Sequence, residues 1–104
     1  MQEAPTSSTD QTITLERNGR QGRYLMSLPD CEPARLTFVE TGPDRIAIDY
    51  SFVPPLYRGR DVALKLIKRA VDDARTKGFK IMPLCGYVAA EFRHHPEWAD
   101  VLET

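Results

Sequence analysis

The sequence predicts a mixed α+β domain, an α/β protein in the broad sense, in which four strands precede one long helix. Two patterns support this prediction. Apolar and polar residues alternate in four stretches before residue 54, as they do in strands with one buried face. Apolar residues then recur at spacings of three and four over residues 62–74, the period of an amphipathic helix. A chain of 104 residues is long enough for one domain with its own core.

The first two strands are predicted to form a hairpin. Thr12–Glu16 alternates between apolar and polar residues, and Tyr24–Leu28 is a second apolar stretch. Arg17–Arg23, with its glycines and asparagine, has the composition of the turn between them. Pro29–Pro33 is expected to be a loop.

Two further strands follow this loop. Arg35–Glu40 alternates again, and Thr41–Asp44 has the composition of a turn. Arg45–Val53 is the longest predicted strand, and Pro54-Pro55 ends it because proline cannot donate to a sheet ladder. An antiparallel meander is the simplest arrangement of these four strands.

The main helix is predicted to end near Lys77, where Gly78 is a natural C-terminal cap. A fifth strand is expected at Phe79–Leu84, a short helix at Tyr87–His94, and one or two helical turns at Pro96–Leu102. The predicted order is β-β-β-β-α-β-α. The apolar face of the main helix is expected to consist of Val62, Leu66, Ile67, Ala70, Val71 and Ala74.

Composition narrows the classes of function. Residues 1–10 are rich in Ser, Thr, Pro and Glu and are expected to be a disordered leader, so the domain is predicted to span residues 11–104. A net charge of −1 gives no reason to expect nucleic acid or an anionic membrane as a partner. The apolar runs are too short to span a bilayer, and the N-terminus lacks the layout of a signal peptide. A cytoplasmic protein is therefore expected.

Cysteine and histidine spacing predicts no metal site. Cys31 and Cys85 fit no metal-binding pattern, and although one disulfide between them is conceivable, free thiols are the expectation for a reducing cytoplasm. His94 and His95 are adjacent, so on a helix they point in different directions. Solvated or capping roles near Pro96 are expected for these histidines.

Residues 58–63 have the layout of a phosphate site. A strand end, a turn with glycine and arginines, and a helix N-terminus present backbone N–H groups and a favourable dipole to an anion. Asp61 stands where such a site would take a glycine. Its carboxylate either fills the anion site with the protein's own charge or faces away and leaves the loop open to a ligand.

The segments around this loop resemble a known superfamily. Arg58-Gly59-Arg60-Asp61-Val62-Ala63, which follows Val53-Pro54-Pro55, resembles the acyl-CoA pyrophosphate loop of the GNAT superfamily of N-acetyltransferases. Pro83-Leu84-Cys85-Gly86-Tyr87-Val88, with His95-Pro96-Glu97 and Trp98 further on, resembles a narrower group of very small, single-domain GNAT-like proteins. The resemblance extends over residues 46–102.

The resemblance implies an acyl-CoA N-acyltransferase (GNAT-like) fold and acetyl transfer from acetyl-CoA to an amine that the sequence does not identify. It places the cofactor's pantetheine arm beside the fourth strand and its pyrophosphate on the loop before the main helix. A monomer or a weak homodimer is expected. The residues implied in cofactor binding are Phe52, Val53, Arg58, Gly59, Arg60, Asp61, Val62 and Ala63.

Three side chains are candidates for catalysis. Cys85 is a nucleophile if a helix N-terminus or a cation lowers its pKa; otherwise it is a small buried hydrophobic residue. Tyr50 and Tyr87 are candidates to protonate the leaving thiolate of CoA, and the alternative for each is packing at the sheet edge.

The chain also departs from the family pattern. Asp61 replaces the loop glycine, Tyr50-Ser51-Phe52 stands where the small proteins carry His-Thr-Glu, and Glu91 stands where an aromatic residue commonly follows Ala89-Ala90. The missing imidazole and carboxylate leave no general base to infer from the family. The alternative function is therefore a non-catalytic CoA-binding or protein-interaction module on a GNAT scaffold.

Overall fold

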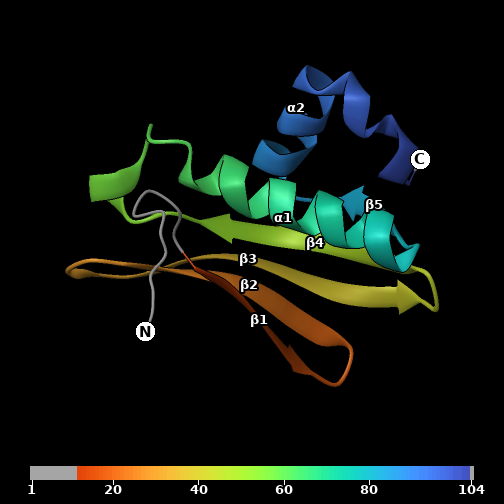
Figure 1. Ribbon diagram of the computed structural model, residues 1–104, viewed down its shortest axis with the longest axis horizontal. Helices are drawn as coiled ribbons and strands as arrows, with labels where there is room; N and C mark the ends of the chain where they lie inside the picture. The colour runs from red at the N-terminus through yellow and green to blue at the C-terminus, as the bar shows by residue number, and fades with distance from the viewer. Residues whose placement is uncertain (1–11, 104) are drawn as a thin grey trace, which may run out of the picture.

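The computed structural model describes residues 12–103, so the expected leader at residues 1–10 lies outside the described part. One layer is a sheet, and helices lie against it (Figure 1). The elements are β1 (Ile13–Asn18), β2 (Gln21–Leu28), β3 (Cys31–Gly42), β4 (Arg45–Phe52), the 3-10 helix η1 (Pro55–Tyr57), α1 (Val62–Lys77), β5 (Lys80–Pro83), α2 (Gly86–His94) and the 3-10 helix η2 (Pro96–Val101).

The strands lie in the order β1-β2-β3-β4-β5 within one sheet. The first four form an antiparallel meander, while β5 pairs with β4 in parallel. A parallel neighbour requires a crossover connection, and α1 provides it. The predicted mixed α+β fold and the meander are confirmed.

The turns are shorter than the sequence predicts. The expected turn at residues 17–23 is reduced to Gly19 and Arg20, and the expected loop at residues 29–33 is reduced to Pro29 and Asp30. Asp30 has a φ of 60°, as the second central residue of a type II turn requires. The polar composition of these segments predicts loops whose backbone groups bond to water. In the structure, strand pairing provides hydrogen-bond partners for these groups instead, so the strands extend until only two-residue turns remain.

The core lies between the sheet and α1. All of the predicted apolar positions of α1 are buried, and the helix ends at Gly78, whose φ of 80° suits a glycine cap. The sheet contributes alternate residues of β2 and β3 to the same core. Its largest fully buried side chains are Tyr24, Met26, Leu36, Ile48, Leu66, Ile67, Ile81, Val71 and Val88.

The β4–β5 pair divides into two halves. Residues 45–48 pair with residues 80–83, and we call these eight residues the closed half. Beyond it, the N–H groups of Leu84 and Cys85 both donate to the Ile48 carbonyl, at 2.9 and 3.1 Å, and β5 ends. Within the described residues, β4 continues to Phe52 with a strand only on its β3 side. We call residues 49–53 and 84–87, where the two chain segments diverge, the open half.

A β-bulge marks the border between these halves. Ile48 pairs with Phe38 and Tyr50 pairs with Thr37, so Asp49 is an extra residue in β4. Bulges bend a strand and redirect its side chains. The bulge lies directly after Ile48, the last residue of β4 in the parallel ladder.

Candidate functional site

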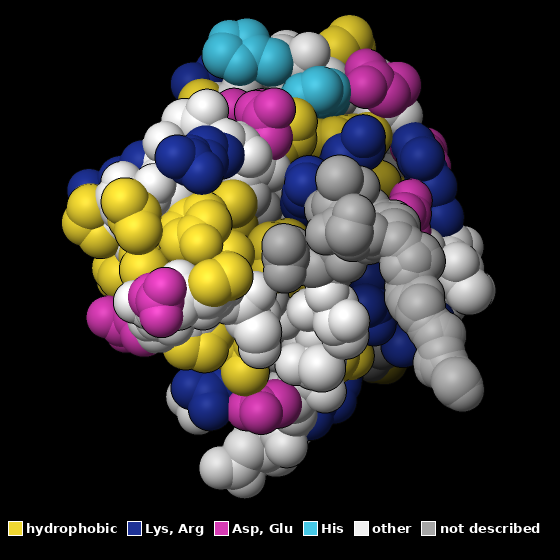
Figure 2. Space-filling view, turned by 60° about the vertical axis from the view of Figure 1, so that its left-hand side comes forward, with side chains coloured by type: hydrophobic (Ala, Val, Ile, Leu, Met, Phe, Trp, Pro, Cys, Tyr) yellow, Lys and Arg dark blue, Asp and Glu magenta, His cyan; other side chains and the backbone are white. Residues whose placement is uncertain are grey.

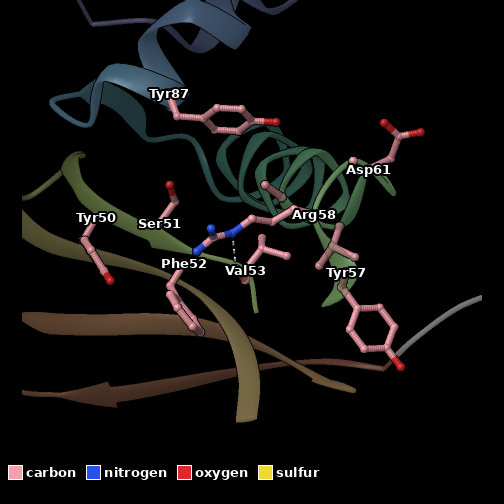
Figure 3. A pocket seen from close by; sticks show the side chains of 11 residues that line it. Tyr50, Ser51, Phe52, Val53, Tyr57, Arg58, Asp61 and Tyr87 are labelled. Carbon is pink, nitrogen blue, oxygen red and sulfur yellow. Dashed lines mark hydrogen bonds between the residues drawn. The ribbon is translucent and has the colours of Figure 1, made fainter. Parts of the chain in front are cut away.

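A pocket of about 450 Å³ lies beside the open half. It is bordered by the end of β4, the η1 segment, the loop before α1, the first residues of α1 and the start of α2 (Figure 3). Its volume falls within the range of small-molecule sites, about 300–1,000 Å³. Its lining residues are Tyr50, Ser51, Phe52, Val53, Tyr57, Arg58, Gly59, Asp61, Val62, Ala63 and Tyr87.

The loop before α1 is fixed to the end of β4. The Nε atom of Arg58 donates to the Val53 carbonyl at 2.9 Å. Gly59 has a φ of 80° and Asp61 a φ of 62°. A left-handed conformation is unfavourable for most residues with a Cβ, but aspartate tolerates it better than most. The backbone at position 61 therefore has the conformation that a glycine would adopt freely.

The carboxylate of Asp61 does not occupy the anion site. Asp61 is exposed and sits at the N-cap position of α1, but its side chain makes no capping hydrogen bond. Its carboxylate points away from Arg58 and Tyr87 (Figure 3). The N–H groups that the first turn of a helix leaves without intrahelical partners are therefore not taken up by this side chain.

The structure brings together most of the residues that the sequence singled out. Among the predicted residues, Arg60 and Cys85 do not line the pocket. The guanidinium of Arg60 lies 5.5 Å from the centre of the Tyr57 ring. Ser51 and Tyr57 line the pocket but were not predicted site residues. Tyr57 directly precedes the predicted loop, and no motif distinguished it.

Tyr50 and Phe52 reach the pocket from β4, but their rings leave it. Figure 3 shows both rings on the side of β4 opposite the Ser51 hydroxyl. The guanidinium of Arg35 lies 4.6 Å from the centre of the Phe52 ring and 5.7 Å from that of Tyr50. Such cation–π contacts hold aromatic rings in place. Tyr50 is thus less well placed than Tyr87 to act on a ligand in the pocket.

Cys85 is the N-cap residue of α2, and its Sγ lies 3.3 Å from the Ser51 Oγ. Burial raises the pKa of the thiol, but hydrogen bonds from the Ser51 hydroxyl and from the N–H groups of Val88 and Tyr87 outweigh it, so the net shift is downward. A helix N-terminus favours a thiolate in this way. The sequence indicated the helix but not Ser51, which only the fold brings close.

Tyr87 lies at the start of α2, with its ring directed across the pocket mouth (Figure 3). Burial of the phenol raises its pKa, and the negative charges of Glu91 and, to a smaller extent, Asp61 raise it further. The side chain therefore stays protonated over the physiological pH range, and its chemistry is that of a proton donor.

Several exposed apolar side chains lie near this site. Figure 2 shows hydrophobic side chains gathered on one face of the molecule. The exposed large hydrophobic residues include Tyr50, Leu84 and Tyr87 of the open half and Leu56 of η1. Exposed apolar side chains near a pocket are typical of a ligand or partner site.

Neither cysteine forms a disulfide. Within residues 12–103, no group of three or more His, Cys, Asp and Glu side chains is placed to hold a metal ion. In the same described range, no helix is long and apolar enough to cross a membrane.

Comparison with known proteins identifies the family. Residues 23–101 match the family described as GCN5-related N-acetyltransferase, and because this match covers most of the chain, the protein belongs to that family. The human protein NATD1 is 27% identical over 85 residues, which cover 81% of this chain and 75% of the human protein. The predicted membership of the GNAT superfamily is confirmed, while the narrower resemblance around Cys85 stays a prediction.

A solved structure supports the same fold. The NMR structure of a GCN5-like protein from Staphylococcus aureus superposes with a TM-score of 0.65 at 19% sequence identity. The superposition covers 86% of this chain and 87% of the bacterial chain. At this identity the likeness concerns the fold, and it confirms the predicted GNAT-like architecture.

Proposed function

We propose that this protein is an acetyl-CoA-dependent N-acetyltransferase whose acceptor is an amine still to be identified. The observation that carries this proposal is the pocket where β4 and β5 diverge, bordered by the N-terminus of α1. Membership of the GCN5-related N-acetyltransferase family supports the reaction type. A cytoplasmic location and a monomeric or weakly dimeric state belong to the same proposal.

The residues of the pocket suit an acyl-CoA. The first turn of α1 offers N–H groups and its dipole to a diphosphate, and Arg58, which lines the pocket, adds positive charge. The edge of β4 at Phe52 and Val53 offers backbone groups to the amides of a pantetheine arm. Gly59 has no side chain to fill the anion site, and the carboxylate of Asp61 makes no capping hydrogen bond and faces outward (Figure 3).

Acetyl-CoA would supply a thioester, whose carbonyl carbon bonds to the amine nitrogen while its carbon–sulfur bond breaks. A backbone N–H near Val53 would stabilise the negative charge that develops on the carbonyl oxygen. Tyr87 would give its hydroxyl proton to the leaving sulfur and regain a proton from solvent. The proton lost by the amine nitrogen would pass to solvent.

Cys85 offers an alternative route. Its thiolate would bond to the thioester carbonyl carbon and expel CoA as the thiolate, which takes a proton from solvent; the amine would then take the acetyl group, release the Cys85 thiolate and lose its own proton to solvent. The short distance to Ser51 and the position at the N-terminus of α2 favour a thiolate. If Cys85→Ala transfers acetyl groups at the wild-type rate with a responsive amine, this route is wrong.

A second candidate function is a non-catalytic CoA-binding module. Among the described residues that line the pocket, Asp61 is the sole carboxylate and there is no imidazole. A general base for the amine is therefore not evident in the pocket itself. Release of free CoA thiol in the presence of an amine panel distinguishes the two functions, because a binding module would release none.

Calorimetric titration with acetyl-CoA at low salt tests the cofactor site. We expect micromolar binding, and no binding at millimolar acetyl-CoA would contradict the proposal. Asp61→Asn removes the charge but tolerates the left-handed backbone. Because the carboxylate is exposed and faces outward, we expect this variant to bind no more than a few-fold more tightly.

Asp61→Gly completes the comparison, because it removes the charge and the left-handed strain together. Equal affinities for the Asn and Gly variants would assign any gain to the charge alone. A gain of tenfold or more in Asp61→Asn would show that the native loop is impaired. That result would favour the second candidate function.

A further inference from the structure

The His-Pro-Glu-Trp segment holds a histidine in a fixed environment. The imidazole of His95 stacks on Trp98, with ring centres 4.1 Å apart and planes 14° from parallel. Its Nδ1 lies 3.0 Å from the Glu97 Oε2, and its Nε2 lies 3.5 Å from the Glu91 Oε1. A solvated or capping role was the expectation from sequence. His95 is the C-cap residue of α2, which agrees with the capping role. In addition, its ring is half-buried and each ring nitrogen lies next to a carboxylate.

The same face of α2 leads from His95 back to the pocket. Tyr87, Glu91 and His95 are spaced four residues apart, so their side chains lie one above the other on the helix. The Glu91 side chain is only 19% exposed. Burial is the largest cause of the raised pKa of Tyr87, and the negative charge and hydrogen bonding of Glu91 are the next largest. The spacing along α2 thus places Glu91 between the pocket residue Tyr87 and His95, and the Glu91 carboxylate lies 3.5 Å from the His95 ring.

We propose that Glu91 and His95 are positioning residues that set the charge beside the Tyr87 hydroxyl and thereby its capacity to donate a proton. This proposal rests on the proposed function in one respect, the role of Tyr87 as proton donor. Histidine changes charge between about pH 5 and 8. A protonated His95 offsets the negative charge of Glu91 and makes Tyr87 a readier donor. A neutral His95 leaves that charge acting on the phenol.

Other charged groups lie near Tyr87, Glu91 and His95. Glu97 of η2 faces the second nitrogen of His95, and its pKa is lowered chiefly by that hydrogen bond. Arg75 of α1 donates to the Glu97 carbonyl at 2.6 Å and adds positive charge nearby. Asp61 acts on Tyr87 from the start of α1. None of these interactions joins His95 to Tyr87 directly, so Glu91 is the group that couples them.

NMR of the full chain without acetyl-CoA tests this coupling. Ring signals of His95, Trp98 and Tyr87 would be followed from pH 5 to 8.5. We expect the Tyr87 signals to shift with the midpoint of the His95 titration. In Glu91→Gln the Tyr87 shift should be lost while Trp98 still follows His95, and in His95→Gln both shifts should be lost. His94→Gln, which changes the exposed neighbouring histidine, should retain both.

Tyr87 signals that stay constant through the His95 titration would overturn the proposal, as would a shift that persists in Glu91→Gln. These measurements need no acetyl-CoA, so their failure is distinct from failure of the proposed function. With an accepted amine, Glu91→Gln and His95→Gln should alter the pH profile of kcat and leave the KM for acetyl-CoA unchanged. A lowered melting temperature with an unaltered profile would mean a merely structural role.

Discussion

The closed and open halves of the β4–β5 pair are formed by the same two chain segments, but the closed half contributes buried residues to the core and much of the open half is exposed beside the pocket. In the closed half, Ile48 and Ile81 are fully buried beneath α1. In the open half, Tyr50, Leu84 and Tyr87 are 46%, 60% and 47% exposed. Backbone groups that leave a ladder need other partners. The candidate site therefore begins where the pairing of β4 with β5 ends. Mutations in the closed half should change fold stability, and mutations in the open half should change ligand binding.

The largest expected effect lies in the closed half. Ile48→Ala removes a fully buried side chain from the core, and we expect it to lower the free energy of unfolding by about 2–5 kcal/mol. Chemical denaturation measures this change. Acetyl-CoA affinity per folded molecule should stay within about twofold of wild type.

Leu84→Ala is the matched change in the open half. Its side chain is exposed, so we expect a loss of unfolding free energy of no more than about 0.5 kcal/mol. If this variant were as unstable as Ile48→Ala, the division into two halves would be wrong.

Two glycines, Gly22 in β2 and Gly86 in the open half, extend the comparison between packed sheet and open half with one added methyl group each. A Cβ at Gly22, beneath the sheet core, would lie 2.3 Å from the Phe38 ring, whereas at Gly86 no atom lies within 4 Å. We expect Gly22→Ala to cost about 1–3 kcal/mol through overpacking. Gly86→Ala, at the first position of α2, should be neutral or slightly stabilising. Thermal unfolding of both variants checks this, and equal destabilisation would contradict it.

The sequence predicted the fold better than the lengths of its parts. The apolar periodicity of α1 and the alternation in the strands come from local patterns, and the structure confirms them. The turn at Gly19 and Arg20 is shorter than expected because Arg17 and Asn18 pair with Gly22 and Gln21 and so extend both strands. The composition of a segment shows how polar it is but not which residues it pairs with.

Local pattern alone predicted only the part of the candidate site that one segment supplies, whereas Tyr50, Phe52 and Tyr87 were named from the family resemblance. The loop from Arg58 to Ala63 is continuous in sequence, so its proximity to the strand end was expected. Ser51 and Cys85, by contrast, are 34 residues apart, and the bulge at Asp49 that shapes the end of β4 depends on pairing with β3. Such juxtapositions follow from register, which the sequence pattern does not specify.

The smallest expected effect concerns the thiol of Cys85. Because its pKa is lowered, its thiolate should form at lower pH than that of an ordinary cysteine, and it should react with iodoacetamide at correspondingly lower pH. Ser51→Ala removes one hydrogen bond to the sulfur and should move this reactivity to higher pH. Cys31→Ser in both proteins confines labelling to Cys85. An unchanged profile in Ser51→Ala would contradict the assigned role of Ser51.

The most direct test of the central claim is a backbone amide NMR titration of the full chain with acetyl-CoA. We predict that shift changes will centre on the open half, the loop at residues 58–61 and the first turn of α1, while residues 45–48 and 80–83 move little. Changes centred on the outer strands β1 and β2, or no changes at millimolar acetyl-CoA, would contradict the account.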